Sequence, residues 1–398
     1  MTATCPDYFQ SCSQFWIWND PMQDWGYRLF LTAIFGFLVS SAYLATQNNW
    51  KFSQLLLVPV FLIEICLGLL LTSDTQTSYE TYLLGLSAIF LFGKRKVASA
   101  RIFIVALYFV IGLSKLNESW LAAGVFSTFK IGLPLLPIEL IPAACFLVIF
   151  SELCLCWWLL SRRRGPQSIA LSVFFIFHIY SFAIIGAGFM LYALAPLFAL
   201  FYRARNHSLR PSGLTIFLIS AVLVANVYPL FLPGDRRETG QGTSLAFTLF
   251  DATRKARSNA VEIDKSGAAH PSPLSASSLD YFRVYKAFAA LKRRCENQDL
   301  ARISWDVDLA LNGQPSKRLI ESENVCALNF KAWQNNDWIR TGAPAEGRIF
   351  DVTTRTSFSS WAQEHLTLLS TIFIALSLVS FLTFAAFNQS SGPRENSV

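Results

Sequence analysis

The residues that could act in catalysis or binding lie inside or at the ends of long apolar runs, and the first of them is Lys115. It closes a run that begins near Tyr108, and Trp120 follows it. A lysine amine at the end of a membrane helix can reach the headgroups and anchor the helix beside an interfacial tryptophan. A lysine amine that is removed from water gives up its proton more readily and can then act as a base. The residues alone leave both roles open.

Three further ionisable residues, Glu64, Glu152 and His178, fall within apolar runs. Such side chains are unfavourable in a membrane and usually face a partner or a cavity. A neutral His178 imidazole can hydrogen-bond a neighbouring helix or a ligand, and Glu152 can pair with Lys115 or His178 across helices. The alternative for each is an ordinary role in helix packing.

Composition decides the environment in which these side chains work. Of the 398 residues, 53% are hydrophobic and 15% are charged, which is too apolar for a soluble enzyme and typical of a polytopic membrane protein. The net charge of +7 comes from short basic clusters between apolar runs, and nothing resembles a nucleic-acid-binding motif. The sequence therefore predicts the lipid bilayer as a partner and excludes nucleic acid.

The elements that position these residues are about nine predicted transmembrane helices. Their apolar runs are residues 28–46, 53–72, 81–93, 102–116, 139–160, 168–188, 189–202, 213–233 and 366–388. The predicted fold class is an all-α polytopic membrane bundle with a small exoplasmic α+β domain inserted before the last helix. The predicted divisions are an exoplasmic N-terminal segment (1–27), a transmembrane helical domain (28–233), an exoplasmic soluble α+β domain (234–364), a C-terminal transmembrane helix (365–388) and a cytoplasmic tail (389–398).

Basic clusters predict the orientation, because cytoplasmic loops collect lysine and arginine. Three clusters lie two predicted spans apart: Lys94-Arg95-Lys96 with Arg101, Arg162-Arg163-Arg164, and Arg203, Arg205 and Arg210. One assignment places all three in the cytoplasm. The N-terminus and region 234–364 are then exoplasmic, the C-terminus is cytoplasmic, and Lys115 lies near the outer face.

Cysteine placement agrees with this orientation. Cys295 and Cys326 fall on the oxidising side and are the first candidates for a disulfide, with Cys5 and Cys12 a weaker pair. The remaining cysteines lie in apolar runs without histidine or carboxylate partners at ligand spacing, so no metal site is predicted; they are Cys66, Cys145, Cys154 and Cys156.

Region 234–364 loses the long apolar runs and shows soluble patterns. Residues 278–297 predict an amphipathic helix with Ser278 as its N-cap. The alternation of Ile303, Trp305, Val307 and Leu309 predicts a strand, and Asn312-Gly313 predicts a hairpin turn that returns the chain near Leu319. Residues 349–353 predict a further strand. No catalytic motif marks this region.

Segments of the apolar region resemble the horizontally transferred transmembrane (HTTM) family and, within it, the vitamin K-dependent γ-glutamyl carboxylases. The family's Tyr-Phe-x-Ala-Gly-x-x-Lys-Leu…Trp signature is similar to Tyr108-Phe109-Val110-Ile111-Gly112-Leu113-Ser114-Lys115-Leu116 with Trp120-Leu121. Its Phe-His…Ile-Gly-x-Phe…Met-Leu…Pro-Leu-Phe segment is similar to Phe177-His178, Ile185-Gly186, Phe189-Met190 and Ala195-Pro196-Leu197-Phe198. A third similarity is Tyr82-Leu83-Leu84-Gly85-Leu86. The resemblance covers roughly residues 20–202.

The resemblance implies a chemistry for these residues. Lys115 would be the base that deprotonates a reduced lipid quinone, vitamin K or menaquinone, held by Tyr108, Trp120 and Glu152, while His178 lines the cavity. In the carboxylases, oxygen addition then yields a strong alkoxide base that takes a γ-proton from a glutamate of a secreted peptide or protein, and the carbanion takes up CO2. The implied co-substrates are O2 and CO2, and no metal takes part.

One motif departs from the carboxylases. Ser78-Tyr79-Glu80 stands where they have Asn-Asn-His, which makes Glu80 the third catalytic candidate. A carboxylate there can pair with Lys115, and such a pair keeps the lysine charged. Two functions stay open: a membrane enzyme that uses Lys115, Glu80 and His178 on a lipid-soluble cofactor or a secreted peptide, or a non-enzymatic scaffold, assembly partner or small-molecule transport unit.

Overall fold

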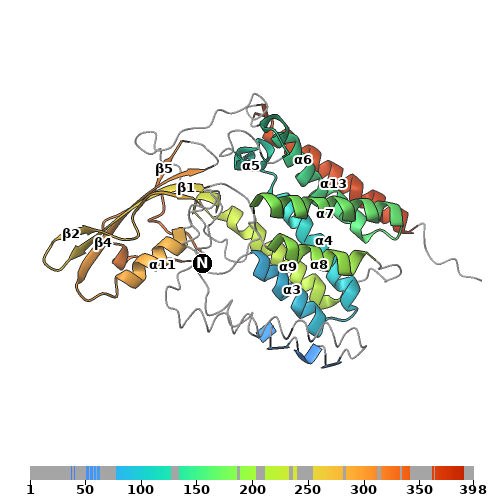
Figure 1. The fold of residues 1–398 in the computed structure, drawn as a ribbon, viewed down its shortest axis with the longest axis horizontal. Helices are drawn as coiled ribbons and strands as arrows, with labels where there is room; N and C mark the ends of the chain where they lie inside the picture. Colours follow the sequence, from blue (N-terminus) through green and yellow to red (C-terminus); the bar gives the residue numbers. More distant parts are fainter. Residues whose placement is uncertain are drawn as a thin grey trace, which may run out of the picture.

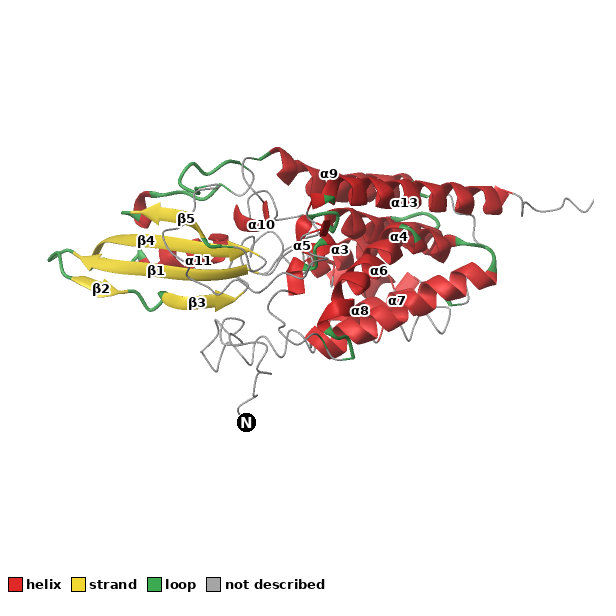
Figure 2. Ribbon diagram, turned by 90° about the horizontal axis from the view of Figure 1, so that it is seen from above, coloured by secondary structure: helices red, strands yellow, loops and turns green. Residues whose placement is uncertain are grey.

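The structure is a computed structural model of the chain. It describes residues 37, 40, 51, 52, 54–56, 58, 59, 61, 62, 78–126, 133, 135–185, 189–202, 211–232, 236–239, 254–280, 284–311, 315–331, 334–340, 361, 362 and 364–389. These residues form a helical part and, beyond one end of it, an antiparallel sheet (Figures 1 and 2). The predicted strand at 349–353, the Asn312-Gly313 turn, the Cys5–Cys12 pair, Glu64 and the N-terminal segment lie outside the described residues.

The helical part is a set of apolar helices packed around α4. In chain order the main helices are α3 (Ser78–Phe92), α4 (Lys96–Ser114), α5 (Glu118–Leu121), α6 (Ile141–Leu153), the 3₁₀-helix η4 (Leu155–Leu160), α7 (Arg164–Ile185), α8 (Phe189–Phe201), α9 (Gly213–Val227) and α13 (Leu366–Gln389). Helix α4 contacts α3, α6, η4, α8 and α9. Short helical turns lie between them: η2 (Gly124–Phe126), η3 (Ile138–Leu140), η5 (Tyr228–Phe231) and α10 (Arg236–Thr239).

The predicted bundle of about nine transmembrane helices is wrong for the part of the chain that the structure describes. Three helices there are long and apolar enough to cross a membrane, at Lys96–Ser114, Arg164–Phe182 and Leu366–Ala385, and Gly213–Val227 is a shorter apolar helix. The reason is length. Helices α6 and α8 have 13 residues each, and at about 1.5 Å per residue they fall short of a hydrocarbon core of about 30 Å.

The run predicted as one span at 139–160 shows why hydropathy overcounts. Helix α6 ends at Leu153, and the chain continues as six residues of 3₁₀-helix in η4. Both pieces are apolar, so a hydropathy window cannot register the change of helix type. The 189–202 run forms one helix, α8, which continues through Pro196 but has only 13 residues and is too short to cross the hydrocarbon core.

The sheet is antiparallel and has five strands in the order β2-β1-β4-β5, with β3 also paired to β1. The strands are β1 (Arg254–Asp264), β2 (Ala269–Pro271), β3 (Ala276–Asp280), β4 (Leu300–Leu311) and β5 (Lys317–Ser322). Helix α11 (Val284–Arg294) supplies Val284, Phe288 and Leu291 to the core on one face of the sheet. Trp305 at the centre of that core is fully buried and donates its indole N–H to Ser258 Oγ at 2.9 Å.

Three predicted elements of this region are present, and the predicted N-cap is wrong. The alternating residues from Ile303 to Leu309 lie in β4, with the odd-numbered side chains in the core, and the returning strand β5 contains Leu319. The amphipathic helix exists as α11, but Ser278 is not its N-cap. Ser278 belongs to β3, since that strand finds hydrogen-bonding partners along β1. The domain boundaries at 234 and 364 stay predictions.

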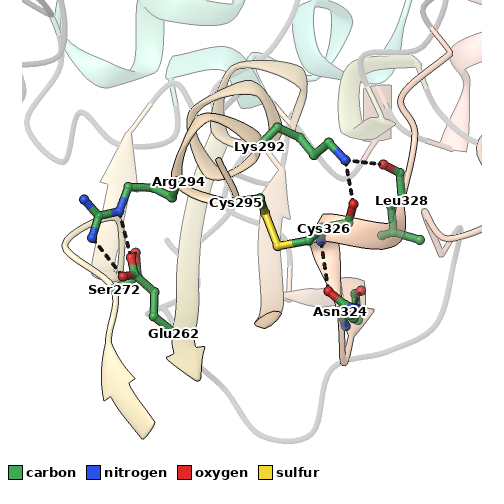
Figure 3. Close-up of a disulfide and its surroundings, with 9 residues drawn as sticks. Glu262, Ser272, Lys292, Arg294, Cys295, Asn324, Cys326 and Leu328 are labelled. Atoms are coloured by element: carbon green, nitrogen blue, oxygen red, sulfur yellow. Dashed lines mark hydrogen bonds and ion pairs between the residues drawn. A yellow bond between two sulfur atoms is a disulfide. The ribbon is translucent and has the colours of Figure 1, made fainter. Parts of the chain in front are cut away.

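The Cys295–Cys326 disulfide is present, as predicted, and joins the end of α11 to the 3₁₀-turn η6 (Val325–Ala327). Figure 3 shows its surroundings: Lys292 Nζ donates to the carbonyl oxygens of Cys326 at 2.7 Å and Leu328 at 3.0 Å. On the other side of α11, Arg294 donates to both carboxylate oxygens of Glu262 at 3.0 and 2.8 Å. These contacts fix the helix on the sheet at both of its flanks.

Candidate functional site

Lys115 stands where α4 ends, and its side chain turns into the protein. The helix stops because Asn117 donates its side-chain amide to Ser114 O at 2.6 Å and its backbone N–H to Lys115 O at 2.8 Å. Lys115 is 3% exposed, so protein encloses the side chain on all sides. A headgroup anchor would lie at the surface. The anchor role considered for Lys115 is therefore excluded by its burial.

The partner of the Lys115 amine is Glu152, one residue before the end of α6. Lys115 Nζ lies 2.5 Å from Glu152 Oε1, and Glu152 is 2% exposed. Pairing two buried charges offsets the loss of hydration that each would suffer alone. The second carboxylate oxygen, Oε2, is buried and has no hydrogen-bond partner in the described chain. It is an acceptor that a bound molecule can use.

Close approach of α4 and α6 makes this pair possible. A methyl group on Gly112 would lie 2.9 Å from side-chain atoms of Leu153 and 3.0 Å from Glu152 Cβ. Those distances are shorter than van der Waals contacts, so a glycine is needed at this crossing. Gly112 lies one turn before Lys115. The same turn of α4 therefore admits the end of α6 and presents the amine to it.

Aromatic rings enclose the amine. Lys115 Nζ lies 4.6 Å from the centre of the Trp120 ring and 5.8 Å from that of Phe177. Both distances are within the range of cation–π attraction, which is stronger where water is excluded. Trp120 comes from α5 and Phe177 from α7. The adjacent ends of α4 and α5 thus meet the distant helix α7 at one charge.

A second polar pair lies beside the first. Tyr108 Oη and His178 Nε2 are 2.6 Å apart, and His178 is 5% exposed. When Tyr108 donates to Nε2, the imidazole proton is on Nδ1, which is buried and without a partner among the described residues. His178 follows Phe177 in α7, and the Phe177 ring lies 5.8 Å from Lys115 Nζ and 5.2 Å from the His178 ring. The site therefore contains one donor, the N–H of His178 Nδ1, and one acceptor, Glu152 Oε2, that have no partner among the described residues, together with the Lys115 amine.

The structure brings together five of the six predicted site residues: Lys115, Glu152, Tyr108, His178 and Trp120. The sixth, Glu80, lies in the first turn of α3, and its side chain is outside the described part. Helices α3 and α4 run antiparallel and touch at Gly85 and Phe103, so the start of α3 lies at the same end of the bundle as Lys115. Glu80 has no described contact with Lys115.

Arg101 differs from its prediction. It was assigned with the basic residues of a cytoplasmic loop, but it lies inside α4 and is 3% exposed. Its guanidinium donates to Leu159 O at 3.1 Å and lies 5.1 Å from the centre of the Phe201 ring. Spacing along the chain could not separate it from its neighbours Lys94 and Lys96, because only burial distinguishes them.

Two groups next to the site were not predicted. Ser377 and Ser380 of α13 donate to the carbonyl oxygens of Leu153 and Cys154, directly after Glu152. Their spacing of three residues in an apolar helix was a usable signal, because two hydroxyl groups on one helix face often bond a neighbouring helix. Gly112 was visible as part of a motif, but its contact with α6 was not.

The site can thus hold and transfer a proton within the bundle. It combines an amine, a carboxyl group, a phenol and an imidazole, with rings instead of water around them. Within the described residues there is no cluster of three or more histidine, cysteine, aspartate or glutamate side chains that could hold a metal ion. The chain matches no family model, no curated protein and no solved structure.

Proposed function

We propose that this chain is a membrane enzyme in which the Lys115–Glu152 pair removes a proton from a hydroxyl group of a lipid-soluble compound, with a reduced quinone as the substrate. The observation that carries the proposal is the buried pair itself, with one carboxylate oxygen unused and the Tyr108–His178 pair beside it. Pairing with a buried lysine accounts for the carboxylate of Glu152, but it does not account for the buried oxygen Oε2 that has no partner in the described chain.

Proton bookkeeping favours this pair as a base. The charged pair and the neutral pair differ only in which partner holds one proton, so the site as a whole is neutral in either form. When the pair takes a proton from a hydroxyl group, Lys115 ends as an ammonium and Glu152 as a neutral acid. The electron pair of the broken O–H bond stays on the substrate oxygen, and the ammonium stabilises that negative charge.

The residues around the pair suit an aromatic hydroxyl compound. A reduced quinone supplies a flat ring and an acidic hydroxyl group. Glu152 Oε2 would accept a hydrogen bond from that hydroxyl, and His178 Nδ1 would bond a second oxygen. Trp120 and Phe177 offer ring faces to it. The similarity of residues 108–121 and 177–198 to the HTTM family supports the same substrate class.

We also propose the orientation in which the Lys115 end faces the exoplasmic side. The sheet lies beyond the end of the helical part at which α5 is found (Figures 1 and 2), and it contains the Cys295–Cys326 disulfide. Disulfides persist in oxidising compartments. The Arg162–Arg164 cluster extends from the turn after η4 into the first residue of α7, and cytoplasmic loops carry such charges.

The test is quinol-dependent oxygen uptake by the purified chain in lipid discs, measured above a protein-free background with reduced menaquinone or vitamin K. Lys115→Met keeps an unbranched side chain of nearly the same length and removes the amine. Lys96→Met removes the other lysine of α4, at its opposite end, and is the matched control. At equal amounts of folded protein, uptake that is lost in Lys115→Met and kept in Lys96→Met supports the proposal. Uptake at the wild-type rate in both variants would refute Lys115 as the base, and a wild type without uptake above background would favour the non-enzymatic scaffold.

A further inference from the structure

The helix that carries Glu152 changes type directly after it. Helix α6 ends at Leu153, and η4 runs from Leu155 to Leu160 as a 3₁₀-helix. A 3₁₀ run of six residues is long, and 3₁₀ segments within a helical run often mark hinges. An α-helix bonds each backbone N–H to the carbonyl four residues back, and a 3₁₀-helix bonds it to the carbonyl three residues back. Where the first pattern changes to the second, two successive carbonyls are directed to the same N–H, so one of them needs another donor. The position of Glu152 depends on how this junction is held.

Helix α13 supplies donors at this junction. Ser377 Oγ donates to Leu153 O at 2.6 Å, and Ser380 Oγ donates to Cys154 O at 2.8 Å. Ser377 Oγ also lies 3.5 Å from Trp157 Nε1, from which it accepts. These bonds bridge 220 to 226 positions of the chain. The C-terminal helix thus reaches the backbone one residue beyond Glu152.

The opposite side of the same junction is fixed by α4. Gly112 lets Leu153 and Glu152 approach within contact of the α4 backbone. The end of α6 is therefore held between Gly112 on one side and the two serines on the other. A carboxyl group one residue from this junction has little freedom to leave the Lys115 amine.

We infer that Ser377 and Ser380 are positioning residues that hold the α6–η4 junction so that Glu152 stays paired with Lys115. The effect of these serines on catalysis rests on the proposed function, whereas their effect on the position of Glu152 does not. Ring packing of α13 on α6 is separate from these bonds, because Phe373 packs on Phe146 at a ring distance of 5.5 Å. Removing the two hydroxyl groups leaves that packing in place.

The experiment compares two double variants of the full chain in lipid discs. Ser377→Ala with Ser380→Ala removes both donors. Thr371→Ala with Thr383→Ala is the matched control, because these exposed hydroxyls bond carbonyls of their own helix, Thr367 O and Val379 O. The first readout is the infrared band of the Glu152 carboxyl group, assigned by its loss in Glu152→Gln. The second is quinol-dependent oxygen uptake.

We expect the serine variant to shift or broaden the Glu152 band and to lower the maximal uptake rate about tenfold, with the half-saturating quinol concentration changed less. The threonine variant should match the wild type in both readouts. An unchanged Glu152 band in the serine variant would overturn the inference, whatever the uptake rate. If the wild type shows no uptake at all, the proposed function fails, but the infrared comparison still decides the positioning role.

Discussion

Lys115 Nζ lies 2.5 Å from Glu152 Oε1, and the two side chains are 4% and 3% exposed. The pair joins the end of α4 to the end of α6 in the interior of the helical part. Its strength and its chemistry have the same origin, since water that would otherwise solvate both groups is excluded.

Breaking this pair on one side should destabilise the protein more than removing it entirely. We expect Lys115→Met or Glu152→Leu alone to lower the free energy of unfolding by about 3–5 kcal/mol, because one buried charge is left without a partner. The double variant should recover most of that loss. Unfolding of all four proteins in the same detergent measures the cycle, and additive losses would contradict the pairing.

The close approach at Gly112 predicts a second effect. Gly112→Ala places a methyl group against Leu153 and Glu152, and we expect a loss of about 1–3 kcal/mol of stability from overpacking. Gly213→Ala in α9 is the control, because nothing lies within 4 Å of its added methyl group. That variant should be neutral or slightly stabilising, since alanine is the better helix former. Equal losses in the two variants would show that the crossing tolerates a side chain.

Acid should weaken the sheet through Glu262. Hydrogen bonds from Arg294, and to a smaller extent from Ser272, lower the pKa of Glu262 below its ordinary value of 4.5. A lowered pKa means that the stabilisation is complete above that ordinary value and is lost as the pH falls through the folded-state pKa. Arg294→Gln should therefore move the acid transition of the buried Trp305 fluorescence to higher pH. A transition at the same pH in wild type and variant would refute this role.

The disulfide should stabilise the sheet by restraining the unfolded chain. Cys295 and Cys326 are separated by 31 positions, and closing a loop of that size contributes about 3–4 kcal/mol. We expect Cys295→Ser with Cys326→Ser to lower the unfolding free energy of the sheet by that amount. Reduction of the wild type should have the same effect and should leave the double variant unchanged. If a reductant lowered the unfolding free energy of the wild type and of the double variant equally, its effect would not come from the Cys295–Cys326 disulfide, and the prediction would fail.

The sheet shows what local pattern can predict. The alternation of Ile303, Trp305 and Val307 reports one buried face directly, so β4 and the returning β5 were predictable. The prediction of Ser278 as an N-cap is wrong because a serine before an amphipathic helix suits both an N-cap and an edge strand. Only the pairing with β1 decides between them, and that pairing is not written in the local sequence.

The helical part shows what a local sequence pattern cannot predict. Hydropathy marks the apolar run that contains Glu152, but it registers neither the 3₁₀ segment after Leu153 nor the serines of α13 that bond to it. Lys115 and Glu152 were both recognisable as buried ionisable residues, and the choice between Lys115 and His178 as the partner of Glu152 needed the crossing at Gly112. Contacts between segments far apart in sequence determine which residue pairs with Glu152.

The most direct test of the central claim is quinol-dependent oxygen uptake by Glu152→Gln, compared with the wild type at equal amounts of folded protein in lipid discs. Glutamine keeps the shape of Glu152 and cannot take up the proton. We predict a fall of about 100-fold or more in the maximal rate, the range of a lost general base. A variant that keeps the wild-type rate would contradict the assignment of Lys115 and Glu152 as the proton-accepting pair.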